Sequence, residues 1–319
     1  MSAFTPLITV GIPVFNGERY LERAIRSLQK QEYPNIDIVI SDNCSTDATQ
    51  NISLRLAAED RRIRYYRNNI NIGAVRNFVK VFELSCGEYF MWAAYDDLWD
   101  PHCLSLLVEE LINWPEAGLA HSGIALIDES EQLLSVEAFP TDDNPNCWSC
   151  IELATKCVRP ARGTPKLNYA MYGLFRSSVL RLAIKYVCDG AMWDRLFVIL
   201  VAMIAPFRYR REPLYHRTLQ DTRADERYLD DTYALQVRTG IGWRYRVTLN
   251  LSKVLISCPS IPLWRKFLIP LLVWSFAKNQ WKKIISAPKK RRHVQKFRTT
   301  GVFKKKKYRD SVKDFYRKE

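Results

Sequence analysis

The stretch YFMWAAYDDLWDP, Tyr89 to Pro101, decides how the chain is interpreted. Its first part, Tyr89–Ala94, is a short apolar run that is typical of a buried strand. Two adjacent carboxylates, Asp96 and Asp97, follow this run, and a helix-like segment, Cys103–Ile112, comes next. Ligands of open α/β sheets bind at the carboxyl ends of strands, so the stretch predicts a site as well as a fold.

The two carboxylates have two possible roles. Their charges repel unless a cation or a ring of donors offsets them. Magnesium fits this need, because it takes one or two carboxylates and completes its shell with water and substrate phosphates. Alternatively, Asp is favoured in turns and helix caps. The motif alone leaves both roles open.

Strand-like and helix-like segments alternate four times up to Ile112, which predicts a mostly parallel sheet with right-handed crossovers. The strand-like runs are Leu7–Ile12, Ile36–Ile40, Ile63–Tyr66 and Tyr89–Ala94. Polar side chains follow three of them, and they would converge at one edge of the sheet: Asn16, Asp42 with Asn43, and Asp96 with Asp97. No GxGxxG follows a strand and no GxxxxGK[ST] is present, which argues against a dinucleotide oxidoreductase and a P-loop phosphotransferase.

The formal net charge of +14 belongs to the end of the chain. From Lys278 onward there are 17 Lys or Arg and 3 Asp or Glu, so the remainder is near neutral. The eight cysteines show no disulfide framework, and the cluster Cys147, Cys150 and Cys157 lacks a fourth zinc ligand. Reduced thiols in a cytosolic protein are therefore expected. The first strand-like run begins at Leu7, so we expect no signal peptide.

Four segments, taken in order, resemble the family 2 glycosyltransferases: PVFNGERYLERAIRSLQKQ from Pro13, IDIVISDNCSTDAT from Ile36, NINIGAVRNF from Asn69, and YDDLWDP from Tyr95. The resemblance covers roughly residues 6–217 and implies an inverting enzyme with the Rossmann-like GT-A fold, a mostly parallel α/β sheet flanked by helices. It divides the chain into a catalytic domain over residues 1–220 and a helical, basic C-terminal region over 221–319. Within the first, residues 1–125 would form the nucleotide-sugar half and 126–220 the acceptor half.

The resemblance also implies roles for individual residues. Those that would bind the nucleotide sugar are Pro13, Phe15, Asn16, Asp42, Asn43, Arg76 and Asp96. Phe15 would lie against the base, and Asn43 stands where many members carry an Asp that accepts a hydrogen bond from uracil. Asn can still accept through its amide oxygen, but it can also donate, so dTDP- and GDP-sugars stay open beside the UDP-sugar that the resemblance favours. Arg76 could equally be a solvated helix residue.

Asp97 would bind the divalent metal ion, Mg²⁺ or Mn²⁺. The usual acidic triplet begins with Asp, whereas this chain has Tyr95, so the metal would depend mainly on one carboxylate.

A second motif, DGAMWDR, leads from Asp189 to Arg195 into the apolar segment Leu196–Ala205. Inverting transfer needs one general base, and a partly desolvated carboxylate suits this role because burial raises its pKa. Asp194 could instead be an acidic residue favoured at a helix N-terminus by the macrodipole. The resemblance favours Asp194 as the base, with Asp189 as the second candidate. It also puts His216 and Arg217 where relatives carry diphosphate-facing groups.

The C-terminal region contains an apolar run of 11 residues, Phe267–Ala277, too short to span a bilayer, which needs about 20. Tryptophans and cations border it, which is typical of an interfacial segment, although a core helix packed on the catalytic domain is also possible. The clusters Lys289–Arg292 and Lys304–Lys307 would attract anionic lipid or nucleic acid. The preceding apolar run favours the membrane.

The sequence therefore predicts a metal-assisted, inverting glycosyltransferase of polysaccharide biosynthesis, peripheral on the cytoplasmic face of the membrane. It would move a sugar to a lipid-linked or cell-surface glycan acceptor. A sugar-nucleotide pyrophosphorylase is an alternative, but PVFNGERY is a poor match to the Gly-rich phosphate loop of those enzymes. A non-enzymatic nucleic-acid-binding protein is another, but it leaves the converging carboxylates unexplained.

Overall fold

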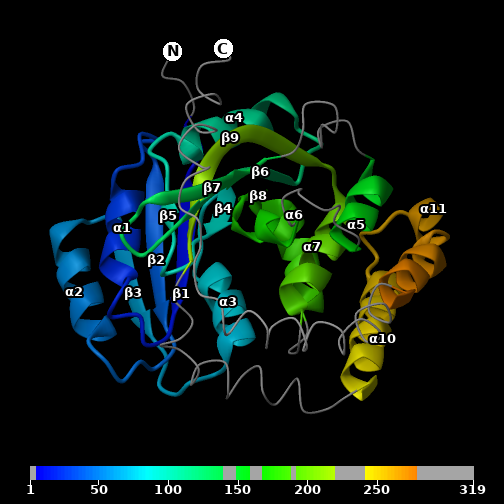
Figure 1. Ribbon diagram of the computed structural model, residues 1–319, viewed down its shortest axis with the longest axis horizontal. Helices are drawn as coiled ribbons and strands as arrows, with labels where there is room; N and C mark the ends of the chain where they lie inside the picture. The colour runs from blue at the N-terminus through cyan, green and yellow to red at the C-terminus, as the bar shows by residue number, and fades with distance from the viewer. Residues whose placement is uncertain (1–4, 139–148, 159–166, 188–191, 220–240, 279–319) are drawn as a thin grey trace, which may run out of the picture.

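The computed structural model describes residues 5–138, 149–158, 167–187, 192–219 and 241–278 (Figure 1). Within these residues, one nine-stranded sheet has the order β3-β2-β1-β4-β8-β6-β9-β5, with β7 paired to β6. Its first half is parallel and its second half is mixed, as described below. The predicted α/β fold with a mostly parallel sheet flanked by helices is confirmed.

The parallel half consists of β1 (Ile8–Val14), β2 (Ile36–Asp42), β3 (Ile63–Arg67) and β4 (Tyr89–Trp92), joined by α1 (Leu21–Gln29), α2 (Thr49–Glu59) and α3 (Ala74–Glu83). β1 extends beyond the strand-like run Leu7–Ile12 of the sequence and continues through Pro13 to Val14. Pairing of β1 with β4 ends at Gly11 opposite Trp92, while Pro13 faces Ser41 of β2. The missing N–H of Pro13 therefore costs no ladder bond on the β4 side.

The mixed half consists of β5 (Leu98–Trp99), β6 (Leu119–Ile127), β7 (Leu133–Glu137), β8 (Leu174–Arg176) and β9 (Phe207–Thr218). The apolar run Leu167–Phe175 looks strand-like in the sequence, but only its end is a strand, because a 3₁₀ helix, η2 (Leu167–Tyr172), precedes β8. Gly173 separates the two, and a Cβ there would overlap the carbonyl oxygen of Ala120. After residue 206 the chain forms one long strand, β9, which runs parallel to β6.

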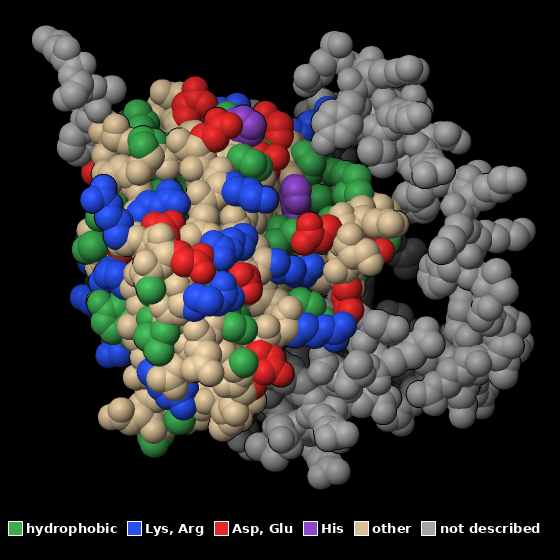
Figure 2. Space-filling model, turned by 90° about the vertical axis from the view of Figure 1, so that its left-hand side faces the viewer, with side chains coloured by type: hydrophobic (Ala, Val, Ile, Leu, Met, Phe, Trp, Pro, Cys, Tyr) green, Lys and Arg blue, Asp and Glu red, His purple; other side chains and the backbone are tan. Residues whose placement is uncertain are grey.

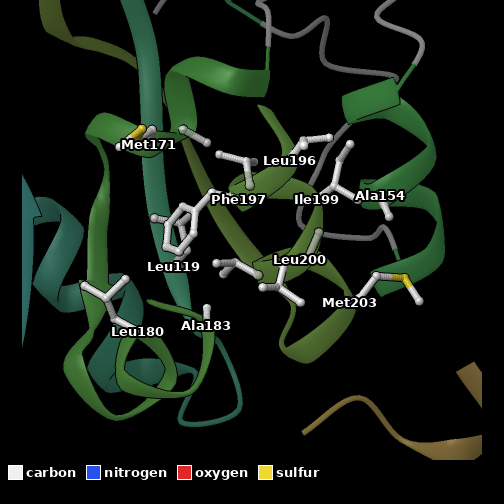
Figure 3. Packing of buried hydrophobic residues seen from close by; sticks show 14 of the residues in the cluster. Leu119, Ala154, Met171, Leu180, Ala183, Leu196, Phe197, Ile199, Leu200 and Met203 are labelled. Atoms are coloured by element: carbon white, nitrogen blue, oxygen red, sulfur yellow. The ribbon is translucent and has the colours of Figure 1, made fainter. Parts of the chain in front are cut away.

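The helices cover both faces of the sheet (Figure 1). One core cluster packs β1 against α1, α2 and α4 (Cys103–Asn113). The other packs α3, α6 (Ser177–Ala183, continued by η3, Ile184–Tyr186) and α7 (Trp193–Ile204) on the opposite face. Leu196 through Met203 of α7 are all buried, and Figure 3 shows Phe197 and Leu200 pointing toward Leu119 and Ile199 toward α5 (Cys150–Val158). A helix that is apolar all round belongs in a core.

The C-terminal helices pack against α7. They are α10 (Ile241–Ser257), α11 (Leu263–Lys266) and a helix over residues 269–278. Leu251 and Leu255 of α10 and Phe276 join the core cluster of α7. None of the described helices is long and apolar enough to cross a membrane.

Acidic and basic side chains are interspersed on the side of the molecule that carries α1 and α2, which Figure 2 faces. Arg26 pairs with Glu59 at 2.6 Å, and Arg55 with Glu22 at 2.7 Å. These exposed pairs contribute little stability. They show that the near-neutral charge before Lys278 is also balanced locally.

Candidate active site

Two adjoining cavities open at the carboxyl ends of the strands. The larger, of about 590 Å³, lies between the loops after β1, β2 and β4 and the start of α3. The smaller, of about 340 Å³, lies between the loop after β4, the 3₁₀ helix η2, α7 and the end of β9. Ala94, Asp96 and Tyr172 line both. The two cavities therefore form a continuous site with Asp96 at the junction.

Most of the residues predicted for the site line these cavities. Those around the larger cavity are Pro13, Phe15, Asn43 and Asp96, and those around the smaller cavity are Asp96, Asp97, Asp194 and Arg217. Four others line neither: Asn16, Asp42, Arg76 and His216. Asp189 lies outside the described residues.

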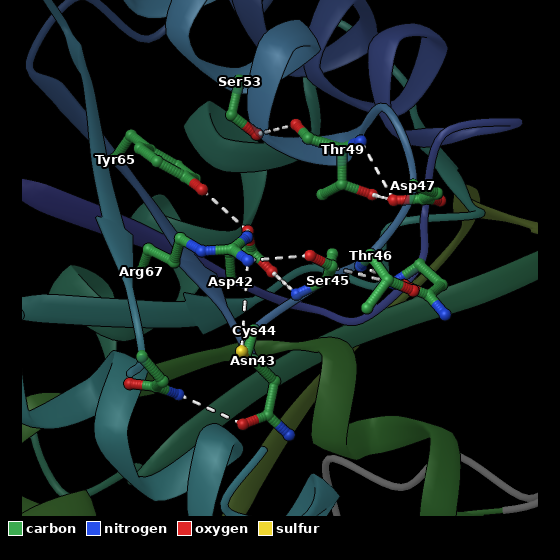
Figure 4. A network of polar contacts seen from close by, with 12 residues as sticks. Asp42, Asn43, Cys44, Ser45, Thr46, Asp47, Thr49, Ser53, Tyr65 and Arg67 are labelled. Carbon is green, nitrogen blue, oxygen red and sulfur yellow. Dashed lines mark hydrogen bonds and ion pairs between the residues drawn. The ribbon is translucent and has the colours of Figure 1, made fainter. Parts of the chain in front are cut away.

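Asp42 is fully buried and anchors the loop after β2 (Figure 4). Its carboxylate accepts hydrogen bonds from the Ser45 amide at 2.8 Å and the Tyr65 hydroxyl at 2.7 Å, and it pairs with Arg67 at 2.8 Å. A buried carboxylate with these partners holds backbone in place. The adjacent Asn43, rather than Asp42, faces the larger cavity.

Asn43 joins the loops after β2 and β3. Its Oδ1 accepts hydrogen bonds from the Ile72 amide at 2.9 Å and from Asn68 at 3.2 Å, and its Nδ2 donates to Asn71 at 2.7 Å. Asn71 lines the larger cavity as well. Part of the lining of the larger cavity is therefore a connected set of amide side chains.

Asn16 and Arg76 stand beside the larger cavity. Asn16 has φ of 51°, and its Oδ1 accepts a hydrogen bond from the Thr46 amide at 2.9 Å, which joins the loops after β1 and β2. Arg76 is exposed on the first turn of α3, whose N-terminal residues Gly73 and Ala74 line this cavity. Both residues belong to the surroundings of the cavity in this conformation.

Asp96 and Asp97 form a pair of acidic groups, of which Asp97 is buried and Asp96 is partly buried. Burial raises the pKa of both carboxyls, and the negative charge of Asp96 raises that of Asp97 further. Tyr215 donates its hydroxyl to one oxygen of Asp97, and the Thr218 amide donates to the other at 2.8 Å. The positive charge of Arg217 partly offsets both carboxylates.

This pair fits a hard divalent cation. An ionised carboxylate offers about four acceptor positions, so Asp97 retains two after its bonds to Tyr215 and Thr218. Among the described residues no group of three or more His, Cys, Asp or Glu could hold a metal ion. Magnesium needs only one or two carboxylates when water and phosphate complete its shell. The donor set therefore suits a metal shared with a phosphorylated ligand.

Arg23 braces the same loop from α1. Its guanidinium donates to the carbonyl oxygen of Asp96 at 2.8 Å and to the Thr218 hydroxyl at 2.6 Å. It thereby connects the loop after β4 to the end of β9. Sequence reasoning missed this role, because Arg23 looks like an ordinary polar position of an amphipathic helix.

Asp194 lies in the first turn of α7, as the sequence predicted. It is partly buried and faces the smaller cavity together with Asp96 and Asp97. Its neighbour Trp193 packs edge-on against Phe78 of α3, with ring centroids 5.0 Å apart. This contact fixes the start of α7 next to the wall of the larger cavity.

Tyrosines that no motif indicated form part of the smaller cavity. Tyr172 stacks on Tyr215 with centroids 5.4 Å apart. Arg217 donates a hydrogen bond to the Tyr169 hydroxyl and lies 4.8 Å from the centre of its ring. The only sequence signal was the aromatic content of these segments. His216 is partly buried in β9, and burial lowers its pKa.

Known proteins resemble this chain in sequence. The model of the family described as "Glycosyl transferase family 2" matches residues 9–133. An uncharacterized glycosyltransferase of Rickettsia typhi is 28% identical over 203 residues, which are 60% of this chain and 59% of the relative. A putative colanic acid biosynthesis glycosyl transferase of Escherichia coli is 39% identical over 105 residues, 32% of this chain and 37% of the relative. The chain thus spans less than two thirds of these relatives.

A third relative is the GalNAc(5)-diNAcBac-PP-undecaprenol beta-1,3-glucosyltransferase of Campylobacter jejuni. It is 32% identical over 133 residues, 41% of this chain and 42% of the relative.

Solved structures share the fold. Staphylococcus aureus TarS 1–349 in complex with UDP has a TM-score of 0.59 at 14% identity, covering 85% of this chain and 70% of that one. A Pyrobaculum calidifontis mannosyltransferase in complex with GDP-Man and Mn²⁺ has a TM-score of 0.50 at 15% identity, covering 90% and 76%. With the family match over residues 9–133 and the converging strand ends, these likenesses show that residues 9–133 belong to glycosyl transferase family 2 and that the chain has the GT-A fold.

Proposed function

We propose that this glycosyltransferase is an inverting, metal-assisted enzyme that moves a sugar from a nucleotide-diphosphate sugar to a hydroxyl of a glycan acceptor. One observation carries the proposal. Asp194 faces a cavity that shares Ala94, Asp96 and Tyr172 with the larger cavity beside it. A donor in the larger cavity would therefore have its reacting end next to a carboxylate from another part of the fold.

The larger cavity is the proposed nucleotide site. Phe15 offers a ring face for a base, and Asn43 and Asn71 offer amide groups for its polar edge. Solved neighbours bind UDP, UDP-GlcNAc and GDP-Man. We propose a UDP-sugar as the donor and retain dTDP- and GDP-sugars for the test below.

Asp97, with Asp96 beside it, would hold the divalent metal ion. When bound, that ion would offset the negative charge of the diphosphate. Arg217 supplies a second positive charge in the smaller cavity, and its bond to Tyr169 fixes its direction. Arg76 is exposed beside the larger cavity, and its side chain is long enough to extend toward the same phosphates.

The transfer itself requires one proton acceptor. The acceptor hydroxyl oxygen attacks the anomeric carbon and forms the new glycosidic bond. The bond from that carbon to the diphosphate oxygen breaks, and the nucleoside diphosphate leaves with the electron pair. Asp194 takes the hydroxyl proton, and configuration inverts because attack and departure occur on opposite faces of the sugar.

We further propose that the acceptor is lipid-linked or part of a surface glycan, and that the protein is peripheral on the cytoplasmic face of the membrane. Two relatives are named for colanic acid biosynthesis and for transfer to an undecaprenol-linked glycan. The charge of +14 carried from Lys278 onward would attract anionic lipids.

The test is a screen of UDP-, dTDP- and GDP-sugars for diphosphate release, with Mg²⁺ or Mn²⁺, followed by NMR of the product anomer. We expect one nucleotide to support turnover and the product to have inverted configuration. A retained anomer would refute the mechanism. Synthesis of a nucleotide sugar from a nucleoside triphosphate and a sugar phosphate would identify a pyrophosphorylase instead.

A further inference from the structure

The C-terminal helices carry a strip of exposed apolar side chains. Its five members, called the apolar strip below, are Leu263 (78% exposed), Trp264 (61%), Phe267 (82%), Leu271 (66%) and Trp274 (59%). Single exposed apolar residues are ordinary, but a contiguous group of large ones marks an interaction surface. The strip lies within 12 residues of sequence, and Trp264, Phe267, Leu271 and Trp274 recur at helical spacing, which places them on one side of the segment.

The strip is held rigidly because the opposite side of the same segment is part of the core. Ile269, Leu272 and Phe276 are buried with α7 and α10. Phe267, Leu271 and Trp274 recur at the spacing of the other helix face. The exposure therefore belongs to a packed amphipathic element.

A second tie comes from Arg265, which fastens α11 to the C-terminal end of α7. Its guanidinium donates to the carbonyl oxygens of Met203 at 2.8 Å and Ile204 at 3.1 Å. These are carbonyl groups that a helix end leaves without intrahelical partners. The strip is thus connected to the same helix whose first turn carries Asp194.

The charge around the strip is of one sign. Residues 263–278 contain Arg265, Lys266 and Lys278 and no Asp or Glu. The Arg265 guanidinium lies 5.0 Å from the Trp264 ring centre, and the Lys278 ammonium lies 4.7 Å from that of Trp274. Each tryptophan of the strip is therefore paired with a cation.

This charge favours one occupant. A second copy docked through the same strip would bring the cations of both copies together, and the residues after Lys278 are themselves strongly basic. An anionic bilayer surface complements both the apolar side chains of the strip and the positive charge around it. Tryptophans and cations lie at the level of the lipid headgroups, and apolar side chains insert below them. We propose that the apolar strip inserts into the interfacial layer of an anionic lipid bilayer.

The inference deepens the proposed membrane location and rests on it. α7 has 12 residues, so it spans about 18 Å at 1.5 Å per residue. The membrane contact at one end of α7 would hold Asp194, at the other end, at a fixed distance from the lipid surface. An acceptor carried on a lipid could then reach the smaller cavity without release from the bilayer.

The test uses the full-length protein and vesicles of phosphatidylcholine with or without phosphatidylglycerol. Phe267→Ser with Leu271→Ser removes two members of the strip and leaves every charge in place. Leu54→Ser with Ile112→Ser, at positions 50% and 51% exposed on α2 and α4, is the matched control. Binding is measured by co-sedimentation at raised salt, which screens the basic residues. Thermal unfolding confirms that both variants fold, and light scattering gives their oligomeric state.

We expect the strip variant to bind anionic vesicles about tenfold or more weakly than wild type, because each apolar side chain withdrawn from water contributes to affinity. The control should bind as wild type does. Equal binding by all three proteins would overturn the inference. So would a wild-type dimer that the strip variant converts to a monomer, because the strip would then be a contact between copies. Diphosphate release, measured without vesicles, reports the proposed function separately.

Discussion

The hydroxyl of Tyr215 donates a hydrogen bond to the carboxylate of Asp97, 118 residues earlier in the chain. The Thr218 amide, on the same strand β9, donates to the second oxygen of that carboxylate. β9, the last described strand along the chain, therefore orients an acidic group that the loop after β4 contributes. The Asp97 carboxylate therefore gains these two hydrogen bonds only when β9 has joined the sheet.

Asp97→Asn should remove most of the divalent-dependent activity and leave the fold intact. The amide oxygen can still accept a hydrogen bond from Thr218, but a neutral amide is a poorer ligand for a hard cation. Diphosphate release across a Mg²⁺ or Mn²⁺ titration measures the effect. Glu116→Gln, at an exposed position, is the control for loss of one negative charge. A titration curve like that of wild type would refute the metal assignment.

Deleting residues 289–319 should weaken binding to anionic vesicles while transfer to a soluble acceptor analogue changes little. The deletion removes the clusters Lys289–Arg292 and Lys304–Lys307, and each cation near an anionic surface contributes about 1 kcal/mol. Co-sedimentation at low salt is the measurement. Binding to DNA of mixed sequence, measured in the same way, tests nucleic acid as the alternative partner of these basic clusters. Equal vesicle binding by the truncated and full-length proteins would contradict the prediction.

His121 should make the protein sensitive to acid. Burial lowers its pKa from 6.5 to about 4, and the ring centre of Tyr209 lies 5.1 Å from that of the imidazole. The unfolded chain therefore takes up this proton first as the pH falls. Stability present above pH 6.5 should decline toward pH 4 by roughly 3 kcal/mol, at 1.36 kcal/mol per pKa unit.

The check is urea unfolding of wild type and His121→Gln between pH 4 and pH 7.5. Other groups that titrate in this range contribute to both proteins and cancel in the difference. The difference in stability should shrink as the pH falls, because only wild type loses the contribution of a neutral buried imidazole. A difference that stays constant with pH would show that His121 does not titrate in this way.

Local sequence pattern was sufficient for the parallel half of the sheet. Each strand there is a short apolar run, and each crossover is a helix with apolar positions at regular spacing. The pattern did not predict the mixed half, where β8 has three residues and depends on the close approach of Gly173 to Ala120. Such an approach is a tertiary contact that hydrophobic periodicity does not reveal.

The cavity-lining residues were predictable where a motif coincides with the end of a strand or, for Asp194, with the start of a helix. Asp96, Asp97 and Asn43 were found in this way, and all three line the cavities. Asp42 comes directly before Asn43, yet alternation along the strand turns it toward Tyr65 and Arg67 instead of the cavity. Tyr172 lines both cavities, but it lies in a 3₁₀ turn with no motif.

Asp194→Asn should reduce turnover by roughly 10²–10⁴-fold, the usual contribution of general base catalysis. The carboxylate lies in the first turn of α7 and faces the cavity that also contains Asp96 and Asp97. Asn has nearly the same size and is compatible with a helix N-terminus, but it cannot accept the proton. Asp194 lines the smaller cavity only, so affinity for the nucleoside diphosphate should barely change.

Both quantities are measured on one preparation, turnover by diphosphate release and affinity by calorimetry with the nucleoside diphosphate. Arg195→Gln, at the next position of α7, is the control for a change of charge in this turn. If turnover of Asp194→Asn stays within a few fold of wild type, the residue serves only the helix N-terminus, and Asp189 becomes the next candidate for the base. If affinity for the diphosphate collapses instead, Asp194 belongs to the nucleotide site, because a general base acts on the acceptor hydroxyl and not on the donor.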